Sequence, residues 1–141
     1  MAEAVYSPIP IESDDAWDGL VSGLPNAHFL QSSAWLRFKG NYGWTQQRYR
    51  LASPDGDLGY AGVLTRRLGH AFTVAYVPRG PLLFHPGRDA LGRALAQLEP
   101  LARRRRWLLL KIDPEIWDAG STCWARPTLE ERGWLPGTPV Q

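Results

Sequence analysis

The spacing of apolar residues predicts several helices along the chain. Leucines recur at every third or fourth position over residues 87–104, which is the period of a helix with one buried face. Pro100 lies inside this pattern and is expected to kink the helix or to end its first part. Shorter helices are predicted over residues 13–23, from Ser32 or Ser33 onward, and over residues 127–132.

Runs of strand-forming residues lie between these helices, over residues 44–52, 58–66, 72–77 and 107–112. The Pro54–Asp57 turn signal joins the first two runs into a predicted hairpin. The last two runs flank the long helix, so they are expected to pair in parallel. Residues 107–112 are nearly all apolar, which is typical of a strand buried on both faces. The order predicts an α/β (α+β) fold with a mixed sheet.

Aromatic residues are concentrated in the second helix. Its predicted buried face carries Trp35, Leu36, Phe38 and Tyr42. Trp44 follows the helix and, like Trp35, is expected in the core. Gln31 precedes the helix, where it can cap the helix or bind a ligand, and capping is the simpler interpretation.

Composition narrows the class of protein. A length of 141 residues suits one domain with a hydrophobic core. A net charge of +2 is too small to indicate nucleic-acid binding by itself. The single cysteine, Cys123, excludes an internal disulfide, and the three histidines lack metal-ligand spacing, so no metal site is predicted. No signal peptide or membrane-spanning run is visible, and a cytoplasmic location is expected.

The Tyr76–Pro81 segment is the first candidate for a functional site. It directly follows a predicted strand and contains two prolines, which remove backbone donors and fix φ. Gly80 is expected to take a backbone angle that other residues avoid. The segment places Tyr76 and Arg79 at the carboxyl end of the strand, where ligands bind in sheets flanked by helices.

Three blocks of sequence stand out among the predicted helices and strands. They are His28–Lys39 followed by Gly43-Trp44, Tyr76–Pro81, and Leu110–Pro114 followed by Gly133-Trp134. In this order and at this spacing, they resemble the FemAB/FemX family of peptidoglycan bridge-forming aminoacyltransferases. The resemblance extends from about Trp17 to Gln141. It implies a GNAT-like acyltransferase fold, which family members contain twice in tandem. Members are more than twice as long, so residues 1–141 are expected to be a single, truncated N-terminal subdomain.

The resemblance also implies a reaction. Family members transfer an amino acid from aminoacyl-tRNA to the stem peptide of a muropeptide precursor, which is lipid-linked or nucleotide-linked. This acyl transfer from an ester to an amine is expected to use aminoacyl-tRNA as co-substrate and to need no cofactor. A monomer in the cytoplasm is expected, with peripheral contact to the inner face of the membrane.

Four residues are the predicted substrate contacts. The resemblance suggests that Lys39 binds phosphates or carboxylates of the precursor, and Arg79 can pair with such groups bidentately. Tyr76 and Lys111 complete the set. Each has a structural alternative: Lys39 as a solvated helix end, Arg79 as a loop support, Tyr76 as a core residue, and Lys111 with Asp113 as a strand-end pair. No general base is predicted.

Two other functions compete with this interpretation. The Arg66–Ala71 segment matches a loose pyrophosphate-loop pattern of acyl-CoA N-acyltransferases, but a strand rather than a helix is expected to follow it. The Arg103–Arg106 run could contact RNA or anionic lipid headgroups, as in a non-enzymatic nucleic-acid-binding module. A solvated helix end is the simpler interpretation of this run.

Overall fold

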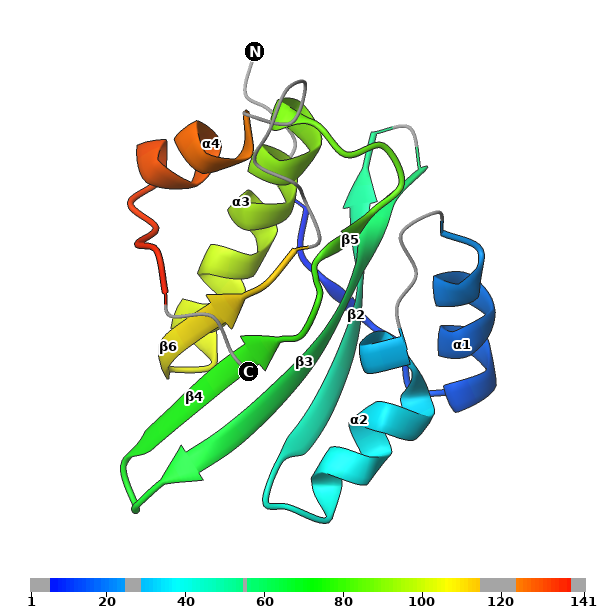
Figure 1. The fold of residues 1–141 in the computed structure, drawn as a ribbon, viewed down its shortest axis with the longest axis vertical. Coiled ribbons are helices and arrows are strands. Elements are labelled where there is room, and N and C mark those ends of the chain that lie inside the picture. Colours follow the sequence, from blue (N-terminus) through cyan, green and yellow to red (C-terminus); the bar gives the residue numbers. More distant parts are fainter. Residues whose placement is uncertain (1–5, 25–28, 55, 115–123, 138–141) are drawn as a thin grey trace.

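One mixed sheet organises the chain, with helices on both of its faces (Figure 1). The computed structural model describes residues 6–24, 29–54, 56–114 and 124–137, so His28 and Cys123 lie outside the described residues. The strand order is β1-β2-β3-β4-β6, and β5 pairs with β3 beside this path. The strands are β1 (Ile9–Pro10), β2 (Thr45–Ser53), β3 (Gly56–Leu68), β4 (Phe72–Val77), β5 (Leu82–Leu83) and β6 (Trp107–Ile112).

Helices α1 and α2 begin where their capping serines predict. They are α1 (Asp14–Ser22), the 3-10 turn η1 (Phe29–Gln31), α2 (Ser33–Gly40), α3 (Arg88–Arg104) and α4 (Ala125–Glu131). The hydroxyl of Ser13 accepts a hydrogen bond from the Ala16 amide, and that of Ser32 accepts one from the Trp35 amide, each at 3.2 Å. These side chains satisfy amides that have no partner inside their helices.

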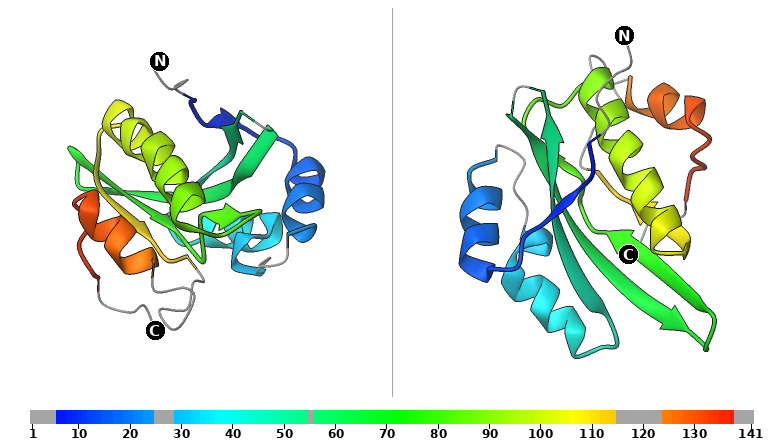
Figure 2. Two further views of the ribbon diagram at one scale, coloured as in Figure 1. Left: turned by 90° about the horizontal axis from the view of Figure 1, so that it is seen from above. Right: turned by 180° about the vertical axis from the view of Figure 1, so that it is seen from behind.

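The two faces of the sheet have separate cores. Helices α1 and α2 lie on one face, whereas α3 lies on the other, with α4 packed against it (Figures 1 and 2). Alternation along β3 divides its side chains: Ala61 and Val63 contact the α3 core, and Tyr60 and Leu64 contact the core beneath α1 and α2. The predicted leucines of α3 are all buried: Leu91, Leu95, Leu98 and Leu101.

The pairing of the strands confirms the predicted hairpin and crossover. Strands β2 and β3 are antiparallel, with Thr45 opposite Thr65. Strands β4 and β6 are parallel, with Val77 opposite Ile112, and α3 connects this part of the sheet. The sheet is therefore mixed, as the order of elements predicted. The two-residue strands β1 and β5 were not predicted, because two residues carry no periodic signal.

One prediction about an individual element is wrong. Strand β6 is not buried on both faces: Leu108 and Leu109 are 63% and 57% exposed, because β6 is at the edge of the described sheet. The long helix, predicted over residues 87–104, runs from Arg88 to Arg104 and does not end at Pro100. Proline removes only one backbone hydrogen bond, and the buried Leu98 and Leu101 hold the last turn against the sheet.

Glu99 joins the two helices of the α3 face. Its carboxylate accepts hydrogen bonds from Arg132 Nε and Nη2 at 2.9 and 2.8 Å, and from Trp134 Nε1 at 3.0 Å. Burial alone would raise the pKa of Glu99, but the bonds from Arg132 and Trp134 outweigh it and lower the pKa. The ionised carboxylate therefore holds the segment after α4 against α3.

The change Glu99→Gln is expected to lower the free energy of unfolding at neutral pH by about 1 kcal/mol, because charge-assisted bonds are replaced by weaker ones. The lowered pKa means that the carboxylate contributes this stability above its unfolded pKa, near 4.5. The contribution disappears as the pH falls through the lower pKa of the folded state. Urea unfolding of both proteins over this pH range measures the difference.

Glu131→Gln is the matched control. Glu131 pairs with Arg88 across the same two helices, but these side chains are 59% and 63% exposed. Its replacement is expected to change the free energy of unfolding by less than about 0.5 kcal/mol. A Glu99→Gln deficit that persists unchanged in acid would contradict the ionic role of Glu99.

Candidate functional site

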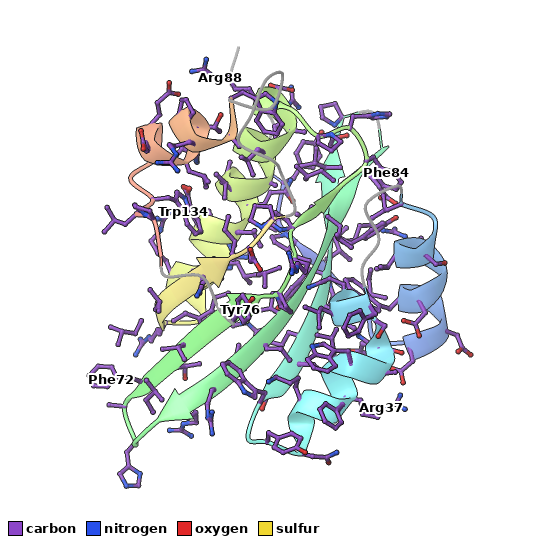
Figure 3. The ribbon with its side chains drawn as sticks, viewed as in Figure 1. Arg37, Phe72, Tyr76, Phe84, Arg88 and Trp134 are labelled. Carbon is purple, nitrogen blue, oxygen red and sulfur yellow. The ribbon has the colours of Figure 1, made fainter. Side chains whose placement is uncertain are left out.

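Among the described residues, the helices on one face of the sheet cover only some of its strands. Alternation along β4 directs Ala75 and Val77 toward the α3 core, so Tyr76 points to the face that carries α1 and α2. These two helices cover β2 and β3, whereas Tyr76 lies on β4 beside the area that α2 covers (Figure 3). The neighbouring side chains on β6 are Leu109 and Lys111, which lie opposite Val74 and Tyr76. Within the described residues no helix therefore covers this face of β4 and β6, which is here called the open shelf.

Four side chains meet where the parallel strands β4 and β6 end. The Lys111 ammonium lies 5.7 Å from the centre of the Tyr76 ring. The Tyr76 hydroxyl donates to Asp113 Oδ2 at 3.4 Å, and Arg79 Nε lies 4.0 Å from the same oxygen. Tyr76, Arg79, Lys111 and Asp113 are here called the strand-end cluster. Three of the four predicted site residues thus come together, and Asp113 accepts a hydrogen bond from Tyr76 and lies within ion-pair distance of Arg79.

The cluster carries more positive than negative charge. Arg79 and Lys111 stand against the single carboxylate of Asp113, and Arg79 is 40% exposed. Burial raises the pKa of Tyr76, and the charge and hydrogen bond of Asp113 raise it further, so the phenol stays protonated at neutral pH. Guanidinium, ammonium and phenol donors in one place suit an anionic ligand such as a phosphate or a carboxylate. Tyr76 is half-buried and belongs to neither core.

The turn after β4 aims Arg79 at this cluster. Arg79 has a φ of 54°, in the left-handed region that non-glycine residues rarely adopt. The unusual angle was predicted for Gly80, which instead avoids a clash: a Cβ there would lie 2.7 Å from Val77 Cγ1. The Asp113 amide donates to the Gly80 carbonyl at 3.1 Å, and the Gly80–Pro81 peptide is cis. These contacts join the turn to the end of β6.

The buried Gln31 side chain supports the turn after β4, a role that the sequence did not predict. Its side chain is fully buried, and Nε2 donates to the carbonyls of Pro78 at 2.5 Å and Gly62 at 3.2 Å. Oε1 accepts from the Gly62 amide at 2.8 Å. The prediction that Gln31 caps α2 is wrong, because Ser32 does so. The sequence shows only a glutamine between Leu30 and the capping Ser32, which does not identify the partners of its side chain.

Lys39 lies apart from the strand-end cluster, on the side of α2. Its ammonium is 5.7 Å from the centre of the Trp35 ring and 5.9 Å from that of Trp44. The guanidinium of Arg66 lies 5.5 Å from the same Trp44 ring. Arg66 pairs with Val74, two residues before Tyr76 on β4. Lys39 and Arg66 therefore lie on the α2 side of the open shelf, and both are close to the Trp44 ring.

The predicted buried face of α2 is wrong in most positions. Of its apolar residues only Leu36 is buried, while Phe38 and Tyr42 are 45% and 58% exposed. Trp35 and Trp44 are half-buried, and only Trp44 packs against the core beneath α1 and α2. Helix α2 is short and contacts the sheet through Leu36. Because residues at other helical positions point in other directions, the neighbouring aromatic residues face outward.

The structure places the two competing motifs in a turn of the sheet and at the end of a helix. Arg66–Ala71 forms the end of β3 and the turn into β4, so the segment leads into a strand, as predicted. Arg103–Arg106 is exposed at the end of α3, on the opposite face of the sheet from α2. Within the described ranges no group of three or more His, Cys, Asp or Glu residues could hold a metal ion. In the same ranges, no helix has the length and apolarity that crossing a membrane requires.

Comparison with known proteins identifies the family. A sequence model of the FemAB family matches residues 14–131, and the chain belongs to this family. Over 105 residues it is 27% identical to the lipid II:glycine glycyltransferase of Staphylococcus saprophyticus, covering 74% of this chain and 25% of the relative. It is 28% identical over 101 residues to the enzyme of that name from Staphylococcus aureus, covering 70% of this chain and 24% of the relative.

A solved structure confirms the class of fold. The crystal structure of FemX superposes on this chain with a TM-score of 0.73 at 24% identity, covering 91% of this chain and 32% of FemX. The mixed sheet and its helices are accordingly GNAT-like. The chain spans about a quarter of the length of the curated relatives that it matches.

Removing the Gln31 side chain is expected to loosen the turn that carries Arg79. Gln31→Ala leaves the Gly62 amide without its acceptor and should lower the free energy of unfolding by about 3 kcal/mol. Hydrogen exchange of the Gly80 and Asp113 amides should accelerate, because the turn loses its bond at Pro78. The two amides can be followed by NMR below the unfolding transition.

Gln97→Ala is the matched control for this change. Gln97 is also buried, and its side chain bonds both backbone groups of Ala52, at 3.3 and 2.8 Å. A comparable loss of stability is expected, without selective acceleration at Gly80 and Asp113. Equal acceleration in both variants would show that Gln31 stabilises the fold without positioning the turn.

The change Asp113→Asn is expected to lower the pKa of Tyr76 toward its ordinary value of 10.0, because a negative charge beside the phenol is removed. Burial, the larger cause, remains, so the pKa stays above that value. NMR titration of the Tyr76 ring measures the shift. Asp57→Asn is the control, since Asp57 bonds Tyr60 rather than Tyr76; an unchanged Tyr76 pKa in Asp113→Asn would contradict the contact.

Proposed function

We propose that this chain is part of an aminoacyltransferase of cell-wall biogenesis, which adds an amino acid to the stem peptide of a peptidoglycan precursor. The observation that carries the proposal is the match of 70% or more of the chain to relatives named lipid II:glycine glycyltransferase. Their name favours a lipid-linked precursor over a nucleotide-linked one. Residues 1–141 are proposed to act as a single N-terminal GNAT-like subdomain of a longer enzyme.

The part of this chain in the reaction is to bind and orient the precursor. Arg79 and Lys111 supply cations at the strand ends, and Lys39 supplies another at the α2 side of the same shelf. Phosphates and carboxylates are the groups of a muropeptide that such cations bind. The Tyr76 ring, under the Lys111 ammonium, is proposed as a further contact.

The proposed chemistry is acyl transfer from an ester to an amine. Aminoacyl-tRNA is the proposed donor, and the amine is that of the stem peptide. The amine loses a proton as it attacks, and the tRNA hydroxyl leaves; the reaction needs neither a metal nor a cofactor. Orientation of the two reactants can supply much of the acceleration. A monomer in the cytoplasm, at the inner face of the membrane, is the proposed setting.

Precursor binding is the test of this function. Calorimetry with a soluble muropeptide should show binding to the 141-residue chain, and Lys39→Ala and Arg79→Ala should each weaken it about tenfold, through loss of a charge-assisted contact. Arg103→Ala is the control, because Arg103 lies at the end of α3 beyond the shelf. Unchanged affinity in both shelf variants would refute the proposed role of the shelf.

The same protein can be used to distinguish the proposed aminoacyltransferase from an acyl-CoA N-acyltransferase, the main alternative function. Thermal stabilisation by acetyl-CoA, with no stabilisation by muropeptide, would favour an acyl-CoA N-acyltransferase. The turn from β3 into β4 argues against that outcome, because the phosphates of acyl-CoA need the amides of a helix N-terminus.

A further inference from the structure

A continuous row of aromatic rings runs along the outer side of η1 and α2. The ring centres of Phe29 and Trp35 are 5.6 Å apart, those of Trp35 and Phe38 are 5.4 Å apart, and those of Phe38 and Tyr42 are 5.1 Å apart. These four residues are here called the aromatic patch. Each ring contacts the next, so the patch is one apolar surface rather than four separate side chains.

The patch faces solvent in the described structure. Phe29, Phe38 and Tyr42 are 64%, 45% and 58% exposed. Contiguous exposed apolar surface is uncommon on a soluble domain, and it marks surfaces that bind a partner or a membrane. The sheet does not need these rings, because α2 already contacts it through the buried Leu36.

Positive charge borders the patch on the side of Trp44. Helix α2 contains Arg37 and Lys39 and no acidic residue, and Arg66 lies beside Trp44. Two carboxylates of α1 lie on the other side of α2: Asp14 forms ion pairs with Arg37 and Arg48, and Asp18 accepts hydrogen bonds from Ser33. The cations next to the aromatic rings are therefore Lys39, beside Trp35 and Trp44, and Arg66, beside Trp44. Arg37 is 67% exposed and projects from α2 (Figure 3).

Aromatic rings bordered by cations suit the headgroup region of a bilayer. Tryptophan and tyrosine concentrate at this depth because their rings are apolar and their polar atoms stay hydrated. Lysine and arginine add attraction to anionic lipids. RNA fits the patch less well, because bases stack on open ring faces, whereas the Trp35 and Phe38 rings are stacked on each other with 29° between their planes.

We infer that the aromatic patch is a docking surface for an anionic lipid membrane. The inference rests on the proposed function in one respect: a lipid-linked precursor lies in a membrane, and the patch borders Lys39 at the margin of the shelf. Docking through α2 places the open shelf next to the bilayer surface. The arginines of α3 lie on the opposite face of the sheet and take no part in this contact.

Vesicle sedimentation tests the inference without any precursor. The 141-residue chain should bind vesicles of phosphatidylcholine with about one-third phosphatidylglycerol at least tenfold more strongly than phosphatidylcholine alone, and added salt should weaken this binding. The double change Phe38→Ser with Tyr42→Ser should lower the partition coefficient about tenfold. Failure of the unsubstituted chain to bind anionic vesicles would overturn the inference, whatever the variants do.

Leu108→Ser with Leu135→Ser is the matched control. These residues are 63% and 88% exposed but lie outside the patch, at the start of β6 and after α4, so vesicle binding should not change. An equal loss in both double variants would overturn the inference, as would binding of single-stranded RNA that depends on Phe38 and Tyr42 without any vesicle binding. Thermal unfolding confirms that each variant is folded.

A soluble muropeptide separates this inference from the proposed function. The Phe38→Ser, Tyr42→Ser variant should bind it as the unsubstituted chain does. Normal muropeptide binding without membrane binding would refute the docking surface alone. Membrane binding without muropeptide binding would refute the proposed function and leave the docking surface standing.

Discussion

The hydrogen bonds of the buried Gln31 side chain are the constraint on which the rest of the structure depends. One amide group satisfies both backbone groups of Gly62 in β3 and the Pro78 carbonyl in the turn after β4. The Gln31 backbone carbonyl accepts from Trp17 Nε1 at 2.6 Å, which adds α1 to the same junction. Unpaired polar groups at this depth would be costly, so the helical layer, the central strand and the Arg79 turn are fixed together. Only glycine fits at position 62, where a Cβ would lie 2.6 Å from Gln31 Oε1.

The arrangement of helices decides where chemistry can occur. Because α1 and α2 cover β2 and β3, the same face of β4 and β6 stays open, and the strand ends deliver cations to it. Lys39 and Arg66 both lie close to the Trp44 ring, so this face carries further positive charge on the α2 side of the strand-end cluster. The aromatic patch begins at this margin, through Trp35. A ligand anchored in a membrane and reaching the shelf would meet both surfaces on one side of the molecule.

Much of the candidate site could be predicted from the sequence, because proline and glycine residues indicate where a strand ends. Proline and glycine after an apolar run identified the turn, and parallel pairing across α3 brought Lys111 beside Tyr76. The partners of Asp113 were not foreseen: it was considered as a strand-end pair with Lys111, whereas it accepts a hydrogen bond from Tyr76 and faces Arg79. Such contacts join residues more than thirty positions apart, and no local pattern encodes them.

The sequence by itself determined the secondary structure and its order. Caps at Ser13 and Ser32, the leucine spacing of α3 and the hairpin turn act within a few residues of one another, so local chemistry suffices. Only the tertiary structure decided which apolar faces are covered. Leu108 and Phe38 are large apolar residues of the kind that fill cores, yet both are exposed. Whether a side chain is buried depends on which element packs against it, and not on its residue type alone. For the same reason only the fold could show that Gln31 is a buried junction and that the aromatic residues of α2 face outward.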